Sequence, residues 1–170
     1  RLQASTNGDK VNVIKHPVGI SVLIRAQPFK TVKGGIMEQL LAHKNQSLIS
    51  HLEGVSQKSE SFAAAFDASI QGKVAGILHD IGKAESEFQK RINSNEKDGE
   101  KQPHAHHAAA HALYGCNPAQ WPIAIAVNGH HAGLHNRGNV DQSAAKYNEK
   151  VKMCLEKIRE TDPGFTIPTS

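Results

Sequence analysis

Apolar residues follow two different patterns along the chain, and the change comes near residue 36. The segments 11-VNVI-14 and 20-ISVLI-24 are short and rich in β-branched residues, and His16-Pro17 and Gly19 separate them. Such runs predict two strands, as in a hairpin. Gly34-Gly35 then interrupts the chain, and a helical pattern begins at Met37. We therefore expect residues 1–36 to be an N-terminal extension, either a small β-hairpin or an addition to the chain, and residues 37–170 to be one domain.

Helical spacing of apolar residues dominates after Met37. Over residues 37–66 the apolar positions predict a helix with one buried face, formed by Leu48, Leu52, Val55, Phe62 and Phe66. Residues 70–82 are interrupted by glycine but are too long for a lone strand, so we predict a buried helix. The polar segment 92–103 and the Gly/Asn/His segment 132–140 are predicted to be loops.

The C-terminal part continues the helical pattern. An alanine-histidine segment (104–114) and an apolar run (121–131) precede an amphipathic stretch, 142–160, which predicts a helix with Val151, Cys154, Leu155 and Ile158 inside. The last residues, 162–170, read as extended or frayed. The fold class expected is all-α, a helical bundle with a small β-like N-terminal appendage.

Composition narrows the class of protein only slightly. The 170 residues are enough for one domain with a core, and 38% hydrophobic residues are ordinary for a globular chain. Neither a bilayer-length apolar run nor a signal-peptide pattern is evident. Two cysteines, Cys116 and Cys154, form no CxxC pair, which favours a reducing, cytoplasmic location. The net charge of +4 is compatible with a polyanionic partner but does not require one.

Histidines are the unusual feature of the composition. The chain has 11, and eight of them lie between His79 and His135. Imidazole nitrogens together with a carboxylate suit divalent transition metals. An aspartate can bridge two ions, and two ions about 3.5–4 Å apart can hold a phosphodiester and activate a hydroxide nucleophile. Helices that point their ligands inward can build such a site from residues that are far apart in sequence.

Each histidine motif taken alone has a simpler explanation. His51 could be a surface or core histidine, and an isolated His79-Asp80 pair is a weak signal. His104, His106, His107 and His111 could be a solvated helix face. The combination is stronger, because each part lies beside apolar sequence and His130-His131 is flanked by Gly129 and Gly133. Adjacent residues on a helix point about 100° apart. His79 and Asp80 can therefore share one cavity only at a helix end or where the cavity encloses the helix.

The surrounding sequence resembles a known family. The order His…His-Asp is that of the HD phosphohydrolase superfamily. The longer phrases 42-AH-43, 51-HLEGV-55, 76-GILHDIGKAESEFQ-89, 104-HAHHAA-109 and 129-GHHAGL-134 look like the HD nuclease domain of the CRISPR-associated type I helicase-nuclease. The resemblance extends from about residue 37 to about residue 138, and the combination of phrases is specific.

The resemblance implies a ligand set for two divalent ions, with Mn, Ni, Co, Fe or Mg as the candidates. His51, His79 and Asp80 would hold one ion, and Asp80 would bridge to a second ion held by His104, His130 and His131. His43 is implied as a residue that supports the site. His106 and His107 are the alternatives to His104 as the ligand. Lys83 would contact the scissile phosphate or its developing charge, or would simply pair with an acid.

The family also uses a late aspartate as a ligand of the first ion. Asp141 and Asp162 are the only aspartates after 129-GHHAGL-134, and neither lies in apolar helical sequence. We therefore expect the domain to be truncated before this ligand.

The function implied is that of a metal-dependent nuclease, acting as an endonuclease or exonuclease on single-stranded DNA in CRISPR type I antiviral defence. Its implied partners are a helicase, fused or separate, and an RNA-guided surveillance complex, with no membrane involved. One alternative is an HD phosphohydrolase acting on nucleotides or cyclic dinucleotides, although no HHExxDGxGYP signature is evident. The other is a degenerate HD binding module.

Basic residues beside the proposed ligands are candidates for a DNA-binding groove. They are Lys83, Lys90, Arg91, Lys101 and Arg137, and each could equally be a solubilising surface charge. Trp121 is expected to pack at a helix start rather than to stack on a base.

Overall fold

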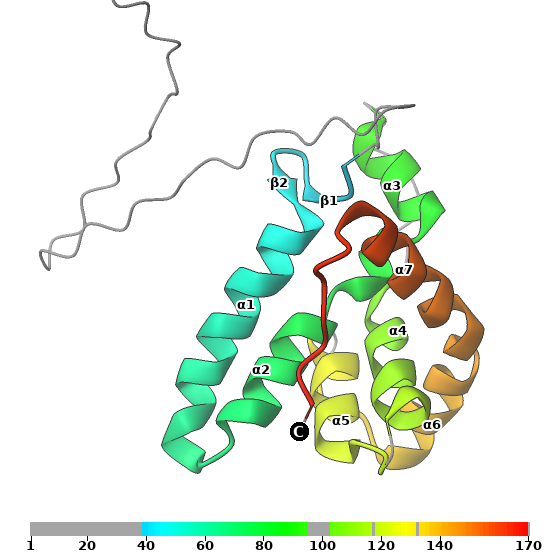
Figure 1. Ribbon diagram of the computed structural model, residues 1–170. Coiled ribbons are helices and arrows are strands. Elements are labelled where there is room, and N and C mark those ends of the chain that lie inside the picture. The colour runs from blue at the N-terminus through cyan, green and yellow to red at the C-terminus, as the bar shows by residue number, and fades with distance from the viewer. Residues whose placement is uncertain (1–38, 95–102, 117, 132, 170) are drawn as a thin grey trace, which may run out of the picture. The chain divides into compact units, whose positions relative to one another are not determined.

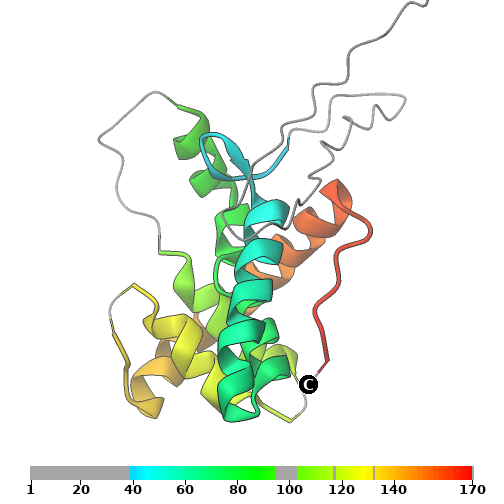
Figure 2. The ribbon, with the colours of Figure 1, turned by 90° about the vertical axis from the view of Figure 1, so that its left-hand side faces the viewer.

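The computed structural model describes residues 39–94, 103–116, 118–131 and 133–169 (Figures 1 and 2). The expected N-terminal extension and its strands 11–14 and 20–24 lie outside these ranges. In the described part, helices account for almost all regular structure, which confirms the all-α class. The α-helices are α1 Leu48–Ala63, α2 Ser69–Leu78, α3 Ser86–Asn93, α4 Ala105–Ala110, α5 Trp121–Gly129, α6 Arg137–Ala145 and α7 Asn148–Thr161. Three single-turn segments join them: the 3₁₀ helices η1 Ala64–Phe66 and η2 Ile81–Ala84, and the π-helix η3 His111–Gly115.

The prediction of a helix from residue 37 was wrong at its N-terminal end. Two short antiparallel strands, β1 Leu41–His43 and β2 Gln46–Ser47, precede α1, with Leu41 opposite Ser47. Leu40 and Ala42 are buried, which is the two-residue period of a strand. The helix begins where Ser47 caps it, because the Ser47 Oγ accepts a hydrogen bond from the Ser50 amide at 3.1 Å.

The predicted buried face of this first helix was only half right. Leu48 and Leu52 are fully buried, but Phe62 and Phe66 are 76% and 82% exposed. The inner side of α1 near its end is formed by small residues, because Gly72 of α2 approaches so closely that a Cβ there would lie 2.4 Å from the Ser59 carbonyl oxygen. The two phenylalanines lie on the outer side and at the turn that follows α1.

Close packing of α1 on α2 determines where the chemistry lies. A Cβ on Gly76 would lie 2.5 Å from the Ser56 Cα, and the Ser56 Oγ donates a hydrogen bond to the Lys73 carbonyl at 2.8 Å. The two helices run side by side in Figure 1. Because they approach so closely, the end of α2 comes within side-chain reach of the start of α1.

Helix α4 lies at the centre of the remaining helices. Its alanines, Ala105 and Ala108–Ala110, are all buried, and it packs against α5, α6, α7 and η2. Small residues let these neighbours approach from several sides. This arrangement brings the start of α4, the end of α5 and η2 together.

Two predicted boundaries in the C-terminal part were wrong. The loop predicted over 132–140 ends early, because Asn136 caps α6 by accepting a hydrogen bond from the Asn139 amide at 2.9 Å. The single helix predicted over 142–160 is divided at residues 146–147, where Tyr147 leaves the helical conformation and packs on His106 and His107. The predicted apolar face Val151, Cys154, Leu155 and Ile158 is buried as expected.

The C-terminal segment is extended, as expected, but it is not frayed. Phe165 is 7% exposed and belongs to the core, and Ile167 packs against it. In Figure 1 this segment runs past α2 and α5. None of the helices in the described ranges is both long and apolar enough to cross a bilayer.

Candidate metal centre

His79 and Asp80 lie where α2 ends. The apolar residues before and after them, Val74, Ile77, Leu78 and Ile81, are buried and fix the chain on both sides. Asp80 leaves the helical conformation, with φ −120° and ψ 16°, and η2 follows at once. The pair therefore meets the geometric condition set by the sequence, since both side chains reach one site at a helix end.

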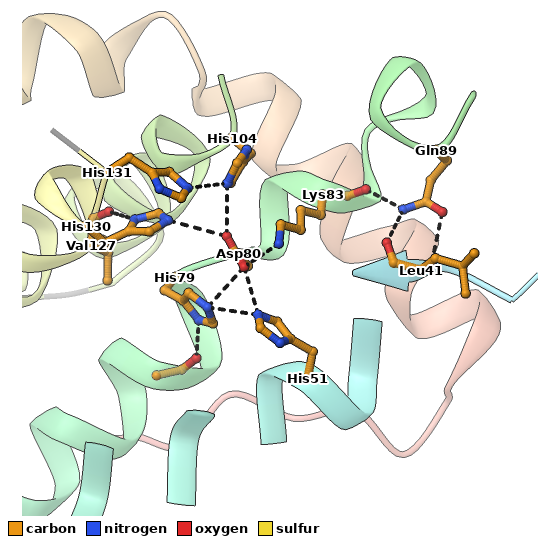
Figure 3. Close-up of polar contacts among 11 residues, drawn as sticks. Leu41, His51, His79, Asp80, Lys83, Gln89, His104, Val127, His130 and His131 are labelled. Carbon is orange, nitrogen blue, oxygen red and sulfur yellow. Dashed lines mark hydrogen bonds and ion pairs between the residues drawn. The ribbon is translucent and has the colours of Figure 1, made fainter. Parts of the chain in front are cut away.

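Three donors form the first half of the centre. The His51 Nε2 lies 2.9 Å from the Asp80 Oδ2 and 3.2 Å from the His79 Nε2, and the His79 Nε2 lies 3.1 Å from the same Oδ2 (Figure 3). The side chains of His51 and His79 are each 15% exposed. Donors from α1 and from the end of α2 thus converge on one carboxylate oxygen.

The second half forms around the other oxygen of Asp80. The His104 Nε2 lies 3.1 Å and the His130 Nε2 3.4 Å from the Asp80 Oδ1, and the His131 Nε2 lies 2.7 Å from the His104 Nε2. His104 comes from the start of α4, and the other two histidines follow α5 (Figure 3). One aspartate is therefore flanked by two groups of imidazoles, one at each oxygen.

The hydrogen bonds of His79 and His130 indicate that this arrangement suits a bound cation. The Nδ1–H of His79 donates to the Gly76 carbonyl at 2.7 Å, and that of His130 to the Val127 carbonyl at 2.6 Å. A neutral imidazole that donates from Nδ1 carries a lone pair on Nε2. In both residues this lone pair faces an oxygen of Asp80. Two lone pairs at such distances repel unless a proton or a metal cation lies between them.

The donor set fits a metal ion in other respects as well. In the part of the chain that the structure describes, the Asp80 Oδ1 is buried and makes no hydrogen bond. Cis ligands about 2.0–2.1 Å from one ion lie about 3 Å apart, close to the nitrogen separations found here. The potential ligand groups in the described residues are His51, His79 and Asp80, and Asp80, His104, His130 and His131.

Electrostatics keep the carboxylate charged. Burial alone would raise the pKa of Asp80, but its contacts with His104, His130 and His79 outweigh burial and hold the pKa well below its usual range. Burial lowers the pKa of His51 despite its contact with Asp80, and burial with two neighbouring imidazoles lowers that of His131. For His130, burial opposes the charged form, but the contact with Asp80 raises the pKa. An ionised carboxylate is the form of Asp80 that binds a metal ion.

Lys83 is buried beside the cluster. Its Nζ lies 2.8 Å from the Asp80 Oδ2, and its side chain is 8% exposed. Gln89 holds this lysine's backbone: its Nε2 donates to the carbonyls of Lys83 (2.6 Å) and Leu41 (2.8 Å), while its Oε1 accepts from the Leu41 amide (2.9 Å) (Figure 3). The structure shows Lys83 paired with Asp80, and its contact with a phosphate stays a prediction.

The alternative histidines lie outside the two donor groups. His43 is exposed, and its ring meets that of His51 edge-on at 5.1 Å. His106 donates from Nδ1 to the Asn128 Oδ1 at 2.7 Å, and His107 is fully buried beside Glu85. Of the three candidates in 104-HAHHAA-109, the structure thus brings His104 to Asp80.

The basic residues are dispersed. Lys90 and Arg91 are exposed on α3, where Lys90 pairs with Glu87 at 2.7 Å. Arg137 lies 4.0 Å above the ring of Trp121 at the start of α5, about 13 Å along that helix from His130. Its closeness to the ligands in sequence is not closeness in space. Lys101 is outside the described residues.

Neither late aspartate joins the cluster. Asp141 lies on α6, is exposed, and accepts a hydrogen bond from the Tyr114 hydroxyl. Asp162 ends α7 and accepts from the Gly164 amide at 3.1 Å. Neither residue belongs to a potential ligand group among the described residues.

Sequence reasoning missed the partners of His106 and His107. Asn128 is buried and bonded to His106, and Glu85 faces His107. The only available signal for Asn128 was a polar residue within an apolar helical run. Nothing in the sequence distinguished Glu85 from its neighbours.

A cavity of about 500 Å³ lies apart from the cluster, between η3 and the C-terminal segment. His111, Arg159 and Phe165 are among its lining residues, and none of the cluster histidines is. The donor set, rather than this cavity, therefore identifies the candidate site.

Comparison with protein families identifies a match. A model of the family described as "Cas3, HD domain" matches residues 34–164. No curated protein and no solved structure matches the chain.

Proposed function

The chain belongs to the Cas3 HD-domain family, and from this premise we propose that it hydrolyses the phosphodiester bonds of single-stranded DNA. The family is one of HD-type, metal-dependent nucleases of CRISPR systems. We further propose that this activity serves type I CRISPR interference.

One observation carries the proposal. Both oxygens of Asp80 are flanked by imidazole nitrogens, at 2.9–3.4 Å, from four separate segments of the chain. A carboxylate between two sets of imidazole ligands is suited to two adjacent cations. The nitrogen-rich set favours Mn, Fe, Co or Ni over Mg, which prefers oxygen ligands.

The proposed ligands are His51, His79 and Asp80 for one ion, and Asp80, His104, His130 and His131 for the other. When bound, the ions would neutralise charge on the scissile phosphate and activate a water molecule as the nucleophile. The backbone carbonyls of Gly76 and Val127 fix the rings of His79 and His130, so that their Nε2 atoms point at the site.

Lys83 contacts the same oxygen of Asp80 as His51 and His79 do. Its ammonium is paired with Asp80 in a buried environment, and it is near enough to stabilise negative charge that develops on a phosphate held there. Gln89 holds the lysine's backbone against β1, so Lys83 has a fixed position before substrate arrives.

The single strand of DNA would pass along the exposed residues of α3. Lys90 and Arg91 offer sequence-independent contacts to phosphates, and Phe88 lies beside His104 with ring centres 5.5 Å apart. We further propose, from the family, that a helicase domain or subunit delivers the strand and that an RNA-guided surveillance complex opens the target. Phage or plasmid DNA would be the biological substrate class.

Cleavage assays on Asp80 variants test the proposal. Asp80→Asn should abolish Mn²⁺- or Ni²⁺-dependent cleavage of linear and circular single-stranded DNA. Asp141→Asn is the matched control, because that aspartate is exposed and outside the cluster. Since Asp80→Asn leaves the buried Lys83 unpaired, circular dichroism must show that it folds. If Asp80→Asn does not fold, the double variant Asp80→Asn/Lys83→Met is used instead, because it removes both buried charges.

The contrary result is equally definite. The proposal is wrong if the pure wild-type protein with Mn²⁺ or Ni²⁺ cuts neither form of DNA but readily hydrolyses nucleotides or cyclic dinucleotides. Cleavage by the folded Asp80→Asn variant at the wild-type rate would also refute it.

A further inference from the structure

Helix α4, which begins directly after His104, is too short to be stable without contacts to its neighbours. It has only six residues before it continues into the short π-helix η3, and no side chain caps its first turn at His104. Isolated helices of this length are unstable in water. The location of His104 relative to Asp80 therefore depends on contacts that the first turn of α4 makes with neighbouring segments.

His107 makes one of these contacts. Its Nδ1–H donates to the His104 carbonyl at 3.3 Å. The same carbonyl is in close contact with η2. A Cβ on Gly82 would lie 2.4 Å from the His104 carbonyl oxygen and 2.6 Å from the His107 Nδ1. His107 thus lies between the turn that carries His104 and the segment that carries Asp80.

The other ring nitrogen of His107 is buried without a hydrogen-bond partner in the described part of the chain. The side chain is fully buried, and its Nε2 faces the Glu85 Oε2 at 3.4 Å without forming a hydrogen bond in the described part of the chain. Glu85 is itself paired with Lys150 at 2.7 Å, and Tyr147 packs edge-on against the histidine with ring centres 4.7 Å apart. An unpaired buried nitrogen destabilises the fold. A leucine would fill the same space without that cost.

His106 makes a contact on the other side of α4. Its Nδ1–H donates to the Asn128 Oδ1 at 2.7 Å, and the same oxygen accepts from the Ser143 Oγ at 3.3 Å. Asn128 is buried on α5, two residues before His130. His106 therefore ties the turn that carries His104 to the helix that carries the other two histidines of that half of the site.

We propose that His106 and His107 are positioning residues, which hold His104 against Asp80 and His130 so that the second ion can bind. His107 sets the distance from α4 to η2, and His106 sets the distance from α4 to α5. The inference rests on the proposed metal centre and adds two residues that are not ligands.

Manganese titration calorimetry on the whole chain, with thermal unfolding in parallel, tests this role. The variants are His107→Leu, which keeps the volume but removes the hydrogen bond, and His107→Asn, whose amide nitrogen takes the place of Nδ1. His106→Leu tests the second contact. The matched control is His111→Leu, since His111 lies on the continuation of the same helix but lines the separate cavity. All measurements are made at pH 7.5.

The expected result separates positioning from stability. Wild-type protein binds two ions, and His107→Leu and His106→Leu bind one of them about 10–100-fold more weakly. The midpoint of unfolding of apo His107→Leu is unchanged or higher, because the unpaired nitrogen is gone. His107→Asn recovers most of the lost affinity, and His111→Leu binds both ions as the wild type does.

Other results overturn the inference. The inference is wrong if both leucine variants bind two ions with wild-type affinity. It is also wrong if His107→Leu loses affinity and His107→Asn does not restore it. If His107→Leu does not fold, His106→Leu decides, because His106 is only partly buried. A wild-type protein that binds no ion would instead refute the metal centre itself, and the inference with it.

Discussion

Adding a single methyl group at Gly82 should separate the two halves of the proposed centre. Gly82 lies two residues after Asp80, and a Cβ there would be 2.4 Å from the His104 carbonyl oxygen and 2.9 Å from its Cα. Ordinary contact begins near 3.4 Å, so the start of α4 and η2 must move apart by about 1 Å. Neither group is the end of a flexible side chain, so the backbone has to move.

The size of the effect follows from that displacement. Overpacking a buried site costs about 1–3 kcal/mol of folding free energy. A domain of this size loses roughly 3–6 °C in Tm for each kcal/mol. Metal ligand distances tolerate only about 0.2 Å, so a shift of about 1 Å between His104 and Asp80 removes one ligand from the second ion. A misplacement of this size can lower a catalytic rate about 100-fold.

Gly82→Ala should therefore be folded, less stable, weaker in binding one of two Mn²⁺ ions, and about 100-fold slower in cutting single-stranded DNA. The matched control is Gly54→Ala on α1, where a Cβ meets nothing within 4 Å. This control should be unchanged or more stable by up to about 1 kcal/mol. If Gly82→Ala matches the wild type in melting, metal affinity and cleavage rate, the close approach of α4 to η2 is not what fixes His104.

Three further predictions concern stability. Gln89→Met keeps the volume but leaves the Lys83 and Leu41 carbonyls without their partner, and urea denaturation should show a loss of about 1–3 kcal/mol; a loss below 0.5 kcal/mol would contradict the role given to Gln89. Burial, with a smaller effect from Arg159, lowers the pKa of His111 below its unfolded value of 6.5, so its contribution to stability is complete above that pH and is lost as the pH falls below it. Thermal midpoints measured from pH 8 to pH 5 should accordingly fall less steeply in His111→Gln than in the wild type, and parallel curves would refute this. Phe62→Ser and Phe66→Ser should each change the free energy of unfolding by less than about 0.5 kcal/mol, because both rings are mostly exposed; a loss above 2 kcal/mol would mean that they are buried.

The convergence of distant residues on one site was the most predictable feature, and the prediction came from a family resemblance. His51, His79-Asp80, His104 and His130-His131 stand in phrases shared with a family, and the structure brings these residues together around one carboxylate. Periodicity also found the buried face of α7, because Val151, Cys154, Leu155 and Ile158 recur at helical spacing over a long segment.

Short elements and helix boundaries could not be predicted in the same way. The strand 41–43 is too short for its two-residue period to stand out from a helical pattern that continues on both sides. Asn136 begins α6 by a single side-chain hydrogen bond, within a sequence whose composition is typical of a loop. The break before α7 depends on Tyr147 packing against α4, which is a tertiary contact.

Sequence position was also a poor guide to which polar residues act together. Arg137 follows the ligand pair closely in sequence, yet it stacks on Trp121 at the far end of α5. Lys150 is distant in sequence and still reaches Glu85, which faces His107. Contacts of this kind depend on how helices are packed, which no local pattern encodes.

The most direct test of the account is anomalous X-ray scattering from crystals of the protein soaked with Mn²⁺. The account predicts two adjacent peaks, one between His51, His79 and Asp80 and the other between Asp80, His104, His130 and His131. Well-ordered side chains with no anomalous peak at either position, at saturating Mn²⁺, would contradict it.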